Sequence, residues 1–181
     1  WIFATPMTTA EIAQKSGRFW YNNLVFYSGE TATGSVTDMY LMMDLDFDDG
    51  KISDGRIKIK TEDNNGEDTW FSKFSGQLSG YQVDITIDEA NHNDSQTATG
   101  TMPIFLTGSS SAAMAGSYRF EESNDSSTFV SGVFLLTGSQ ATDSRLSAAD
   151  KYRLINDPSA GFISIGLPNT YGISHDSGQN P

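Results

Sequence analysis

The chain has 181 residues, with 23 acidic and 11 basic side chains, two histidines and no cysteine. A net charge of −12 argues against nucleic-acid binding, which needs a basic surface for the phosphates. Without cysteine there are no disulfides, thiolate metal sites or thiol nucleophiles, and two histidines are too few for most histidine-based metal or triad chemistry. No apolar run reaches the roughly 20 residues of a membrane-spanning helix, so we expect a chain that does not span a membrane.

The start of the chain predicts a short helix. Thr8 is followed by Glu11 three positions later, which is the pattern of a capping box. Residues 1–17 are therefore predicted to form an N-terminal segment with one short helix. Because the chain begins with Trp1 rather than methionine, we expect a mature, cut or partial chain.

The end of the chain differs in composition from the middle. Residues 147–155 are a second helix candidate, which Pro158 would end. From residue 159 the chain is rich in glycine, serine and asparagine and has no periodicity. Residues 139–181 are therefore predicted to be a C-terminal extension with one short helix and an extended tail or linker.

Alternation of apolar and polar residues predicts strands in the middle of the chain. Every odd position of residues 39–47 is apolar, and residues 56–60 alternate in the same way. Between them Asp48, Asp49 and Gly50 form a turn signal, since glycine readily adopts positive φ. The two segments predict a β-hairpin.

The pairing of this hairpin predicts a β-bulge. A four-residue turn over residues 48–51, continued without interruption, places Arg56 opposite Met43 on the core face. One extra residue near Gly55 restores an apolar face. The pairs predicted in this way are Phe47 with Ile52 before the bulge and, after it, Asp44 with Arg56, Met43 with Ile57 and Leu41 with Ile59.

Further alternating segments follow at the spacing of a barrel or sandwich. They are residues 18–28, a strand from residue 34 onward, 70–78, 81–88, 99–106, 117–121 and 128–136. Short connections between about eight antiparallel strands predict an all-β fold, an up-and-down β-barrel over residues 18–138 that closes to remove its edges. We expect its interior to be filled by bulky side chains, namely Phe19, Trp20, Tyr21, Phe26, Tyr27, Trp70, Phe71 and Phe74.

Several short segments also occur in an order typical of one family. They are residues 1–6 with the short helix, an aromatic strand ending at Tyr27-Ser28-Gly29, residues 44–47 followed by 52–55, residues 74–76, residues 114–120 and residues 130–134. In this order they resemble the small β-barrel domain of transferrin-binding-protein-B-like surface proteins, a barrel also seen at the C-terminus of FecR-domain bacterial surface proteins.

The resemblance covers about residues 1–138. It implies an eight-stranded barrel on a bacterial cell-surface or secreted protein that works by binding rather than catalysis. The chain departs from the family near Ala112-Ala113-Met114, which lacks the aromatic-glycine-proline step, and in its long C-terminal extension. Partner recognition in the iron-acquiring members lies in variable loops, so the resemblance assigns no binding residue.

Asp44, Asp46 and Asp48 are the only candidate metal ligands. Their alternation is that of a calcium loop, but Asp49 and Gly55 occupy the positions where such a loop needs glycine and glutamate. Alternate strand residues also lie about 7 Å apart, too far to share one ion. An acidic outer strand face with a turn is the favoured interpretation, and no cofactor is predicted.

The candidate ligand-binding residues are two aromatic and two basic side chains. Trp20 and Tyr21 are adjacent in a strand and face opposite sides, so one of them lies outside the barrel, either shielded by the N-terminal segment or exposed as a binding patch. Lys58 and Lys60 belong to a cluster of five basic residues that either docks an acidic partner or balances neighbouring acids. The cluster comprises Lys51, Arg56, Lys58, Lys60 and Lys73.

No catalytic residue is predicted. Asp84, Asp88 and Glu89 offer carboxylate pairs of the kind that glycoside hydrolysis uses, but chance pairs are expected among so many acids on solvent-facing strand positions. His92 is placed in a polar loop over residues 91–97, and His175 in the tail, both as bystanders rather than metal ligands.

The leading hypothesis is a non-catalytic, extracellular β-barrel module of a bacterial surface or secreted protein, acting in protein binding, adhesion or surface assembly. Its partner is another protein or copies of itself, with a homo-oligomer or filament formed through residues 139–181. One alternative is an iron- or haem-acquisition receptor that captures a host carrier protein. A carbohydrate-active enzyme is a further alternative, which would require carboxylates that converge in a pocket.

Overall fold

The computed structural model describes residues 4–63, 66–108 and 113–141. The chain divides into two units, Trp1–Thr142 and Asp143–Pro181, and all of the described residues belong to the first. Its elements are α1 (Thr9–Ile12), β1 (Arg18–Thr31), β2 (Ser35–Asp46), β3 (Lys51–Asp63), β4 (Gly66–Ser79), β5 (Gln82–His92), β6 (Gln96–Thr101), β7 (Ile104–Thr107), β8 (Ala113–Glu122) and β9 (Asp125–Gln140).

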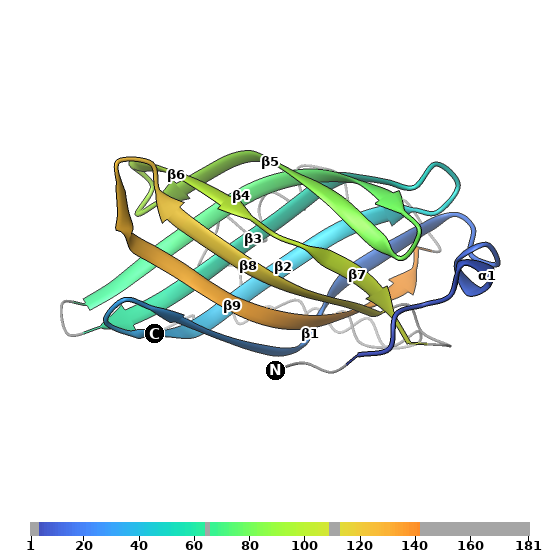
Figure 1. Cartoon of the computed structure of the whole chain (residues 1–181), viewed down its shortest axis with the longest axis horizontal. Helices are drawn as coiled ribbons and strands as arrows, with labels where there is room; N and C mark the ends of the chain where they lie inside the picture. The colour runs from blue at the N-terminus through green and yellow to red at the C-terminus, as the bar shows by residue number, and fades with distance from the viewer. Residues whose placement is uncertain (1–3, 64–65, 109–112, 142–181) are drawn as a thin grey trace, which may run out of the picture. The chain divides into compact units, whose positions relative to one another are not determined.

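The strands form one antiparallel sheet that closes on itself (Figure 1). Strands that follow one another along the chain are neighbours in the sheet, except for β6 and β7, and β9 pairs with β1 to complete the ring. Because β6 and β7 share the position between β5 and β8, the ring has eight strand positions. The predicted all-β, up-and-down barrel is confirmed.

The predicted strand over residues 99–106 is broken into β6 and β7. The break falls at Met102 and Pro103. Proline has no N–H to donate to a ladder and fixes its own φ, so it interrupts a strand that the alternation alone would continue. The described part of the chain therefore has nine strands where about eight were predicted.

The β2–β3 hairpin contains the predicted bulge near Gly55. Between two successive ladder pairs, β3 has one residue more there than β2 on one side of it and β4 on the other. Its register differs from the prediction by two residues. Gly50, at φ +71°, donates its N–H to the Asp46 carbonyl, so the strands close at the pair Asp46–Lys51 rather than at Phe47. The observed pairs are Leu45–Ile52, Met42–Arg56, Leu41–Ile57 and Met39–Ile59, in place of Phe47–Ile52, Asp44–Arg56, Met43–Ile57 and Leu41–Ile59. A shift of two residues keeps every side chain on its predicted face.

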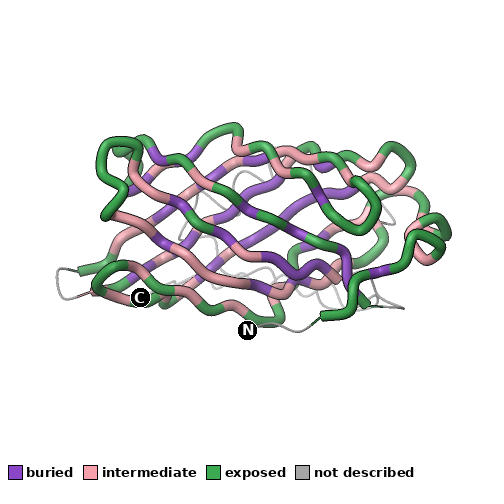
Figure 2. The backbone as a smooth tube through the Cα atoms, viewed as in Figure 1, coloured by how far each residue is buried: buried purple, intermediate pink, exposed green. Residues whose placement is uncertain are grey.

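The interior is filled by side chains, as expected, and every strand contributes at least one buried residue (Figure 2). Tyr21, Trp70 and Phe74 are buried as predicted. Phe26 is not, because the extra residue Val25 bulges from β1 against β9 and turns the following side chain outward. The buried aromatic side chains are Tyr21, Trp70, Phe74, Tyr118, Phe120 and Phe134.

Five of these aromatic side chains lie directly over a glycine of the adjacent strand. A Cβ atom added to Gly55 would lie 2.1 Å from the Phe74 ring, and one added to Gly100 would lie 2.2 Å from the Phe120 ring. The glycines leave the space that the rings occupy, which is a known way to stabilise glycine in a sheet. The cross-strand pairs are Gly55–Phe74, Gly100–Phe120, Gly116–Phe134, Gly132–Tyr118 and Gly138–Tyr21.

The N-terminal segment packs beside β7 at one end of the barrel, where Figure 1 shows α1. Pro6 bridges to Thr107, the Met7 N–H donates to the Leu106 carbonyl, and the Met7 side chain is buried in the core. The predicted capping box is confirmed: the Glu11 N–H donates to the Thr8 hydroxyl, and the Glu11 carboxylate accepts from the Thr8 N–H.

At the other end of the chain β9 extends to Gln140, two residues beyond the predicted barrel boundary. The helix predicted over residues 147–155 and the tail from residue 159 lie outside the described residues.

We expect Gly55→Ala to lower the free energy of unfolding by about 1–3 kcal/mol, because the added methyl group collides with the Phe74 ring. Chemical denaturation measures the change. Ser53→Ala, at an exposed position of the same strand, is the control and should have little effect. In the double variant Gly55→Ala/Phe74→Leu the two losses should be less than additive; strict additivity would show that the ring and the glycine are not coupled.

Candidate functional site

The wall of the barrel is open between β5 and β6. Within residues 82–107, all of which are described, the ladder joins β5 to β6 and β7 only at the two ends of the interface. Residues 84–90 and 98–103 form no ladder pairs with each other. The joining pairs are Asn91–Thr97 and His92–Gln96 at one end, and Gln82–Phe105 and Val83–Ile104 at the other.

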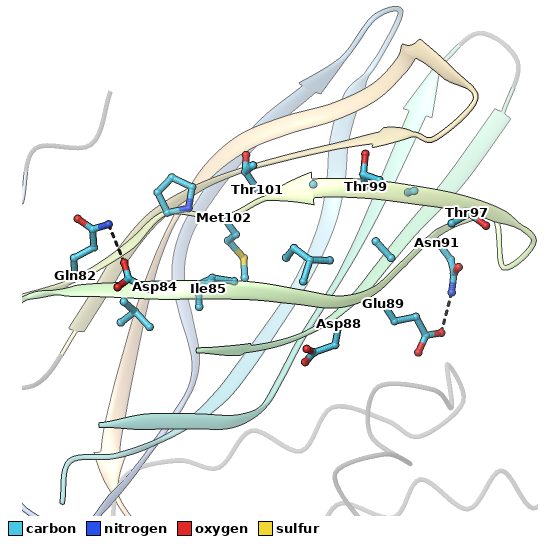
Figure 3. Close-up of a pocket in the computed structure, with 16 residues that line it drawn as sticks. Gln82, Asp84, Ile85, Asp88, Glu89, Asn91, Thr97, Thr99, Thr101 and Met102 are labelled. Atoms are coloured by element: carbon cyan, nitrogen blue, oxygen red, sulfur yellow. Dashed lines mark hydrogen bonds between the residues drawn. The ribbon is translucent and has the colours of Figure 1, made fainter. Parts of the chain in front are cut away.

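This opening is a groove of about 990 Å³, lined by residues 82–85, 87–91 and 97–103 (Figure 3). We call it the wall groove. Figure 3 shows Met102 extending toward β5, whereas the Thr99 and Thr101 side chains point away from it. Ile85 and Ile87 are half-buried and pack against the core, so the groove has an apolar floor, and it has a polar rim.

The β5 edge presents backbone groups to the wall groove. Backbone groups of successive strand residues point to opposite sides, and the Tyr81 carbonyl accepts from the Leu106 N–H across the junction with β7. Counting in steps of two from Tyr81, the N–H and C=O groups of Ile85 and Ile87 face the groove. Those of Asp84 and Thr86 face β4, which pairs with the opposite edge of β5, with one register shift between Lys73 and Phe74.

The β6 edge is oriented in the same way. The carbonyls of Thr97 and Pro103 accept from the N–H groups of Ser123 and Ser117, on the side of β8. The intervening even-numbered residues, Ala98, Gly100 and Met102, therefore direct their backbone groups toward the groove. Two strand edges thus face each other with ladder positions that no described residue fills, which is the arrangement to which an added strand binds.

The rim of the wall groove is acidic. Asp84, Asp88 and Glu89 line it, and no lysine or arginine is among the described residues that do so. The Ser75 hydroxyl donates to Asp88 (3.1 Å), and the Gln82 side-chain amide reaches Asp84 at 3.4 Å. Glu89 accepts from the Lys73 ammonium group, and this hydrogen bond is the main reason that the pKa of the Glu89 carboxyl lies below its usual value; a bond from Asn91 adds to the effect.

A buried histidine closes one end of the groove. His92 Nδ1 lies 2.6 Å from Glu122 Oε1 on β8, and the imidazole ring stacks on Trp70 of β4 with ring centroids 4.1 Å apart. His92 Nε2 is 3.6 Å from Asp68. The prediction that His92 lies in a loop is wrong: it is the last residue of β5, and its side chain links β4, β5 and β8.

Two exposed aromatic side chains mark the other end. Tyr81 and Phe105 are 48% and 37% exposed, and Phe105 pairs with Gln82 of the groove rim. Large aromatic side chains at the surface are frequent anchors of protein interfaces.

A second interruption of the ladder, between β1 and β2, lacks these features. The strands pair at residues 18–21 with 43–46 and again at Glu30–Ser35. Between these points the Tyr27 hydroxyl donates to the Thr37 carbonyl (3.2 Å) and spans the interruption.

The aromatic binding candidates lie away from the groove. Tyr21 is fully buried over Gly138, and burial raises the pKa of its hydroxyl, so it cannot contact a partner at the surface. Trp20 is half-buried on the outer face, in register with Asp44 of β2 and Ser139 of β9.

The basic residues proposed as ligand-binding candidates lie in a part of the sheet that also carries many carboxylates. Lys60 is 3.0 Å from Glu67, and Lys58 lies between Tyr40 and Phe71 in the sheet. The other members of the predicted basic cluster also face carboxylates, in the pairs Lys51–Asp49, Arg56–Asp54 and Lys73–Glu89. This arrangement balances charge across neighbouring strands.

The aspartates of the calcium-loop pattern bind protein groups instead of sharing one site. Arg18 approaches Asp44 and Asp46 at 3.8 and 3.6 Å, and Asp48 accepts from the Gly17 N–H (2.9 Å). Asp44 is buried, contrary to its prediction as part of an exposed acidic face. Across the described ranges, no three His, Asp or Glu side chains converge in a geometry that could hold a metal ion.

Comparisons with protein-family models, with curated proteins and with solved structures gave no match for this chain. The resemblance to transferrin-binding-protein-B-like barrels therefore stays a prediction. In the described part of the chain, no helix is long and apolar enough to cross a membrane.

The sequence contained a partial signal for the groove. Pro103 within a predicted strand indicates an interrupted or edge position. The absence of pairing between the middle of β5 and β6 could not be predicted, because residues 81–88 alternate between apolar and polar side chains as regularly as a strand that is paired on both edges.

We expect Glu122→Gln to lower the free energy of unfolding by about 1–3 kcal/mol, because it removes the charged partner of a buried imidazole. Hydrogen exchange should also speed up at the Gln96 and Thr97 amides, which belong to the pairs that close the groove. Glu121→Gln is the matched control, since Glu121 forms only a surface ion pair with Arg119. Equal effects of the two variants would contradict a closing role for His92.

We expect Lys73→Gln to raise the pKa of the Glu89 carboxyl toward its ordinary value, because the ammonium group is the main cause of its lowering. Carbon-13 NMR of the side-chain carboxyl measures this titration. The stabilisation from the Lys73–Glu89 pair should be present above the ordinary pKa and be lost as the pH falls through the lowered pKa. Lys51→Gln, at a separate ion pair, is the control and should leave the Glu89 titration unchanged.

Proposed function

We propose that this chain is a non-catalytic β-barrel module of a bacterial surface or secreted protein and that it binds a protein partner through the wall groove. The observation that carries the proposal is the pair of strand edges at residues 84–90 and 98–103, which form no ladder with each other or with another described residue on the groove side. Because buried side chains fill the barrel interior and leave no lumen for a small ligand, we place binding at the barrel wall and its loops.

The acids of the groove suit binding better than catalysis. A general acid in glycoside hydrolysis needs a raised pKa, whereas the hydrogen bond from Lys73 lowers the pKa of Glu89. Asp84 and Asp88 project from the outer face of one strand, on either side of Thr86, with Gln82 and Ser75 as their neighbours. The exposed rings of Tyr81 and Phe105 add apolar contact area at the end of the groove.

The surface location rests on the family resemblance and on the acidic composition. The alternative of haem acquisition gains no support from His92, whose ring is enclosed by Trp70 and Glu122. The proposed assembly through residues 139–181 concerns residues that lie almost entirely outside the described ranges.

Selection of random linear peptides displayed on phage against the immobilised full chain tests the proposal. We expect enriched peptides that bind Thr99→Lys/Thr101→Lys at least tenfold more weakly, because lysines on the exposed outer face of β6 discourage another strand from pairing beside it. Asn22→Lys/Ser139→Lys adds the same charge on β1 and β9 and should bind normally. Enrichment of no peptide, or equal binding to both double variants, would refute binding through the groove.

A further inference from the structure

We propose that the segment bound in the wall groove is an extended, lysine- or arginine-bearing polypeptide strand that pairs with the β5 edge. This inference rests on the proposed function and adds the conformation and charge of the bound segment. It follows from three properties of the groove: the direction of its backbone groups, the alternation of its side chains and the sign of its charge.

The direction of the backbone groups favours a strand over a helix or a folded surface. Ile85 and Ile87 each present one N–H and one C=O to the groove, and Ala98, Gly100 and Met102 present theirs from the opposite edge. An extended segment has donors and acceptors at the same two-residue spacing, so it can satisfy the β5 groups as a ladder does. A helix satisfies its own backbone groups and has none to offer.

The alternation of β5 side chains determines which side-chain pattern the added strand should have. Ile85 and Ile87 face the core, whereas Asp84, Thr86 and Asp88 are exposed on the outer face. A strand paired with β5 therefore places one set of side chains over the apolar floor, beside Met102 and Ala98, and the other set beside the two aspartates. Apolar residues that alternate with basic ones fit both faces.

The charge of the rim selects a basic partner. Asp84, Asp88 and Glu89 line the groove, and none of its described lining residues is a lysine or arginine. Within the described ranges, Glu89 is the one of these three acids that forms an ion pair, with Lys73. A second copy of this chain, with a net charge of −12, would be repelled by the same surface. The occupant is therefore a basic segment of another protein.

A synthetic nine-residue peptide that alternates lysine with valine is the probe. We expect it to bind the full chain, and the same peptide with glutamate in place of lysine to bind at least tenfold more weakly. N-methylation of every second residue, on the peptide edge that faces β5, should weaken binding at least tenfold by removing ladder donors. On binding, the Ile85 and Ile87 amides should become protected from hydrogen exchange.

The acidic rim is tested with Asp84→Asn/Asp88→Asn, which should bind the lysine peptide at least fivefold more weakly and lose most of the salt dependence. Glu30→Gln/Glu62→Gln removes the same charge from β1 and β3 and should bind as the unmodified chain does.

The outcomes separate this inference from the proposed function. If phage-selected peptides need the groove but N-methylation has no effect, protein binding stands and strand pairing is refuted. Protection confined to Ala98, Gly100 and Met102 would refute pairing with β5. Equal binding of the glutamate peptide would refute the basic partner, and a concentration-dependent dimer that Thr99→Lys/Thr101→Lys abolishes would make a second copy the occupant.

Discussion

The barrel depends on the fit between large aromatic side chains and the glycines that face them from the adjacent strand. Eight strand positions enclose little more volume than their own side chains need, so a ring fits only where its neighbour has no side chain. The pairs Gly116–Phe134 and Gly132–Tyr118 lie on β8 and β9, and Gly138–Tyr21 continues the series across the closure to β1. The Gly138–Tyr21 contact joins strands at opposite ends of the described barrel sequence, so it helps to fix the register in which the ring closes.

The same packing explains why an incomplete wall is tolerated. Phe120 covers Gly100 of β6 from the inside, and β5 is paired with β4 along its other edge, so both sides of the groove are held without a direct ladder between them. The backbone groups that lack ladder partners border an open groove, where water can bind them, and they do not carry the cost of buried, unpaired groups. His92 and its partners Trp70 and Glu122 then set where the opening ends.

Much of the fold could be predicted from the sequence because alternation and turn chemistry are local. The capping box at Thr8 and the bulge beside Gly55 are both present. The predicted hairpin register was wrong by two residues, because alternation determines only which face of the sheet a residue occupies. Which residues pair across the hairpin depends also on the turn, where the Gly50 N–H donates to the Asp46 carbonyl. The groove depends on which edges fail to pair, a property of two strands together that neither strand shows alone. His92 was misplaced for a similar reason, since its buried partners come from β4 and β8.

An open strand edge promotes aggregation, because other copies of the same chain can pair with it. Natural proteins often guard such edges with charge, and here the guard is a pair of aspartates on a chain that is acidic overall. These aspartates act selectively, because their charge repels further copies of this acidic chain and attracts a segment of opposite charge. The same carboxylates then serve both solubility and recognition. The strong negative charge of the chain therefore has a role beyond keeping its surface solvated. It determines which strand can complete the barrel wall.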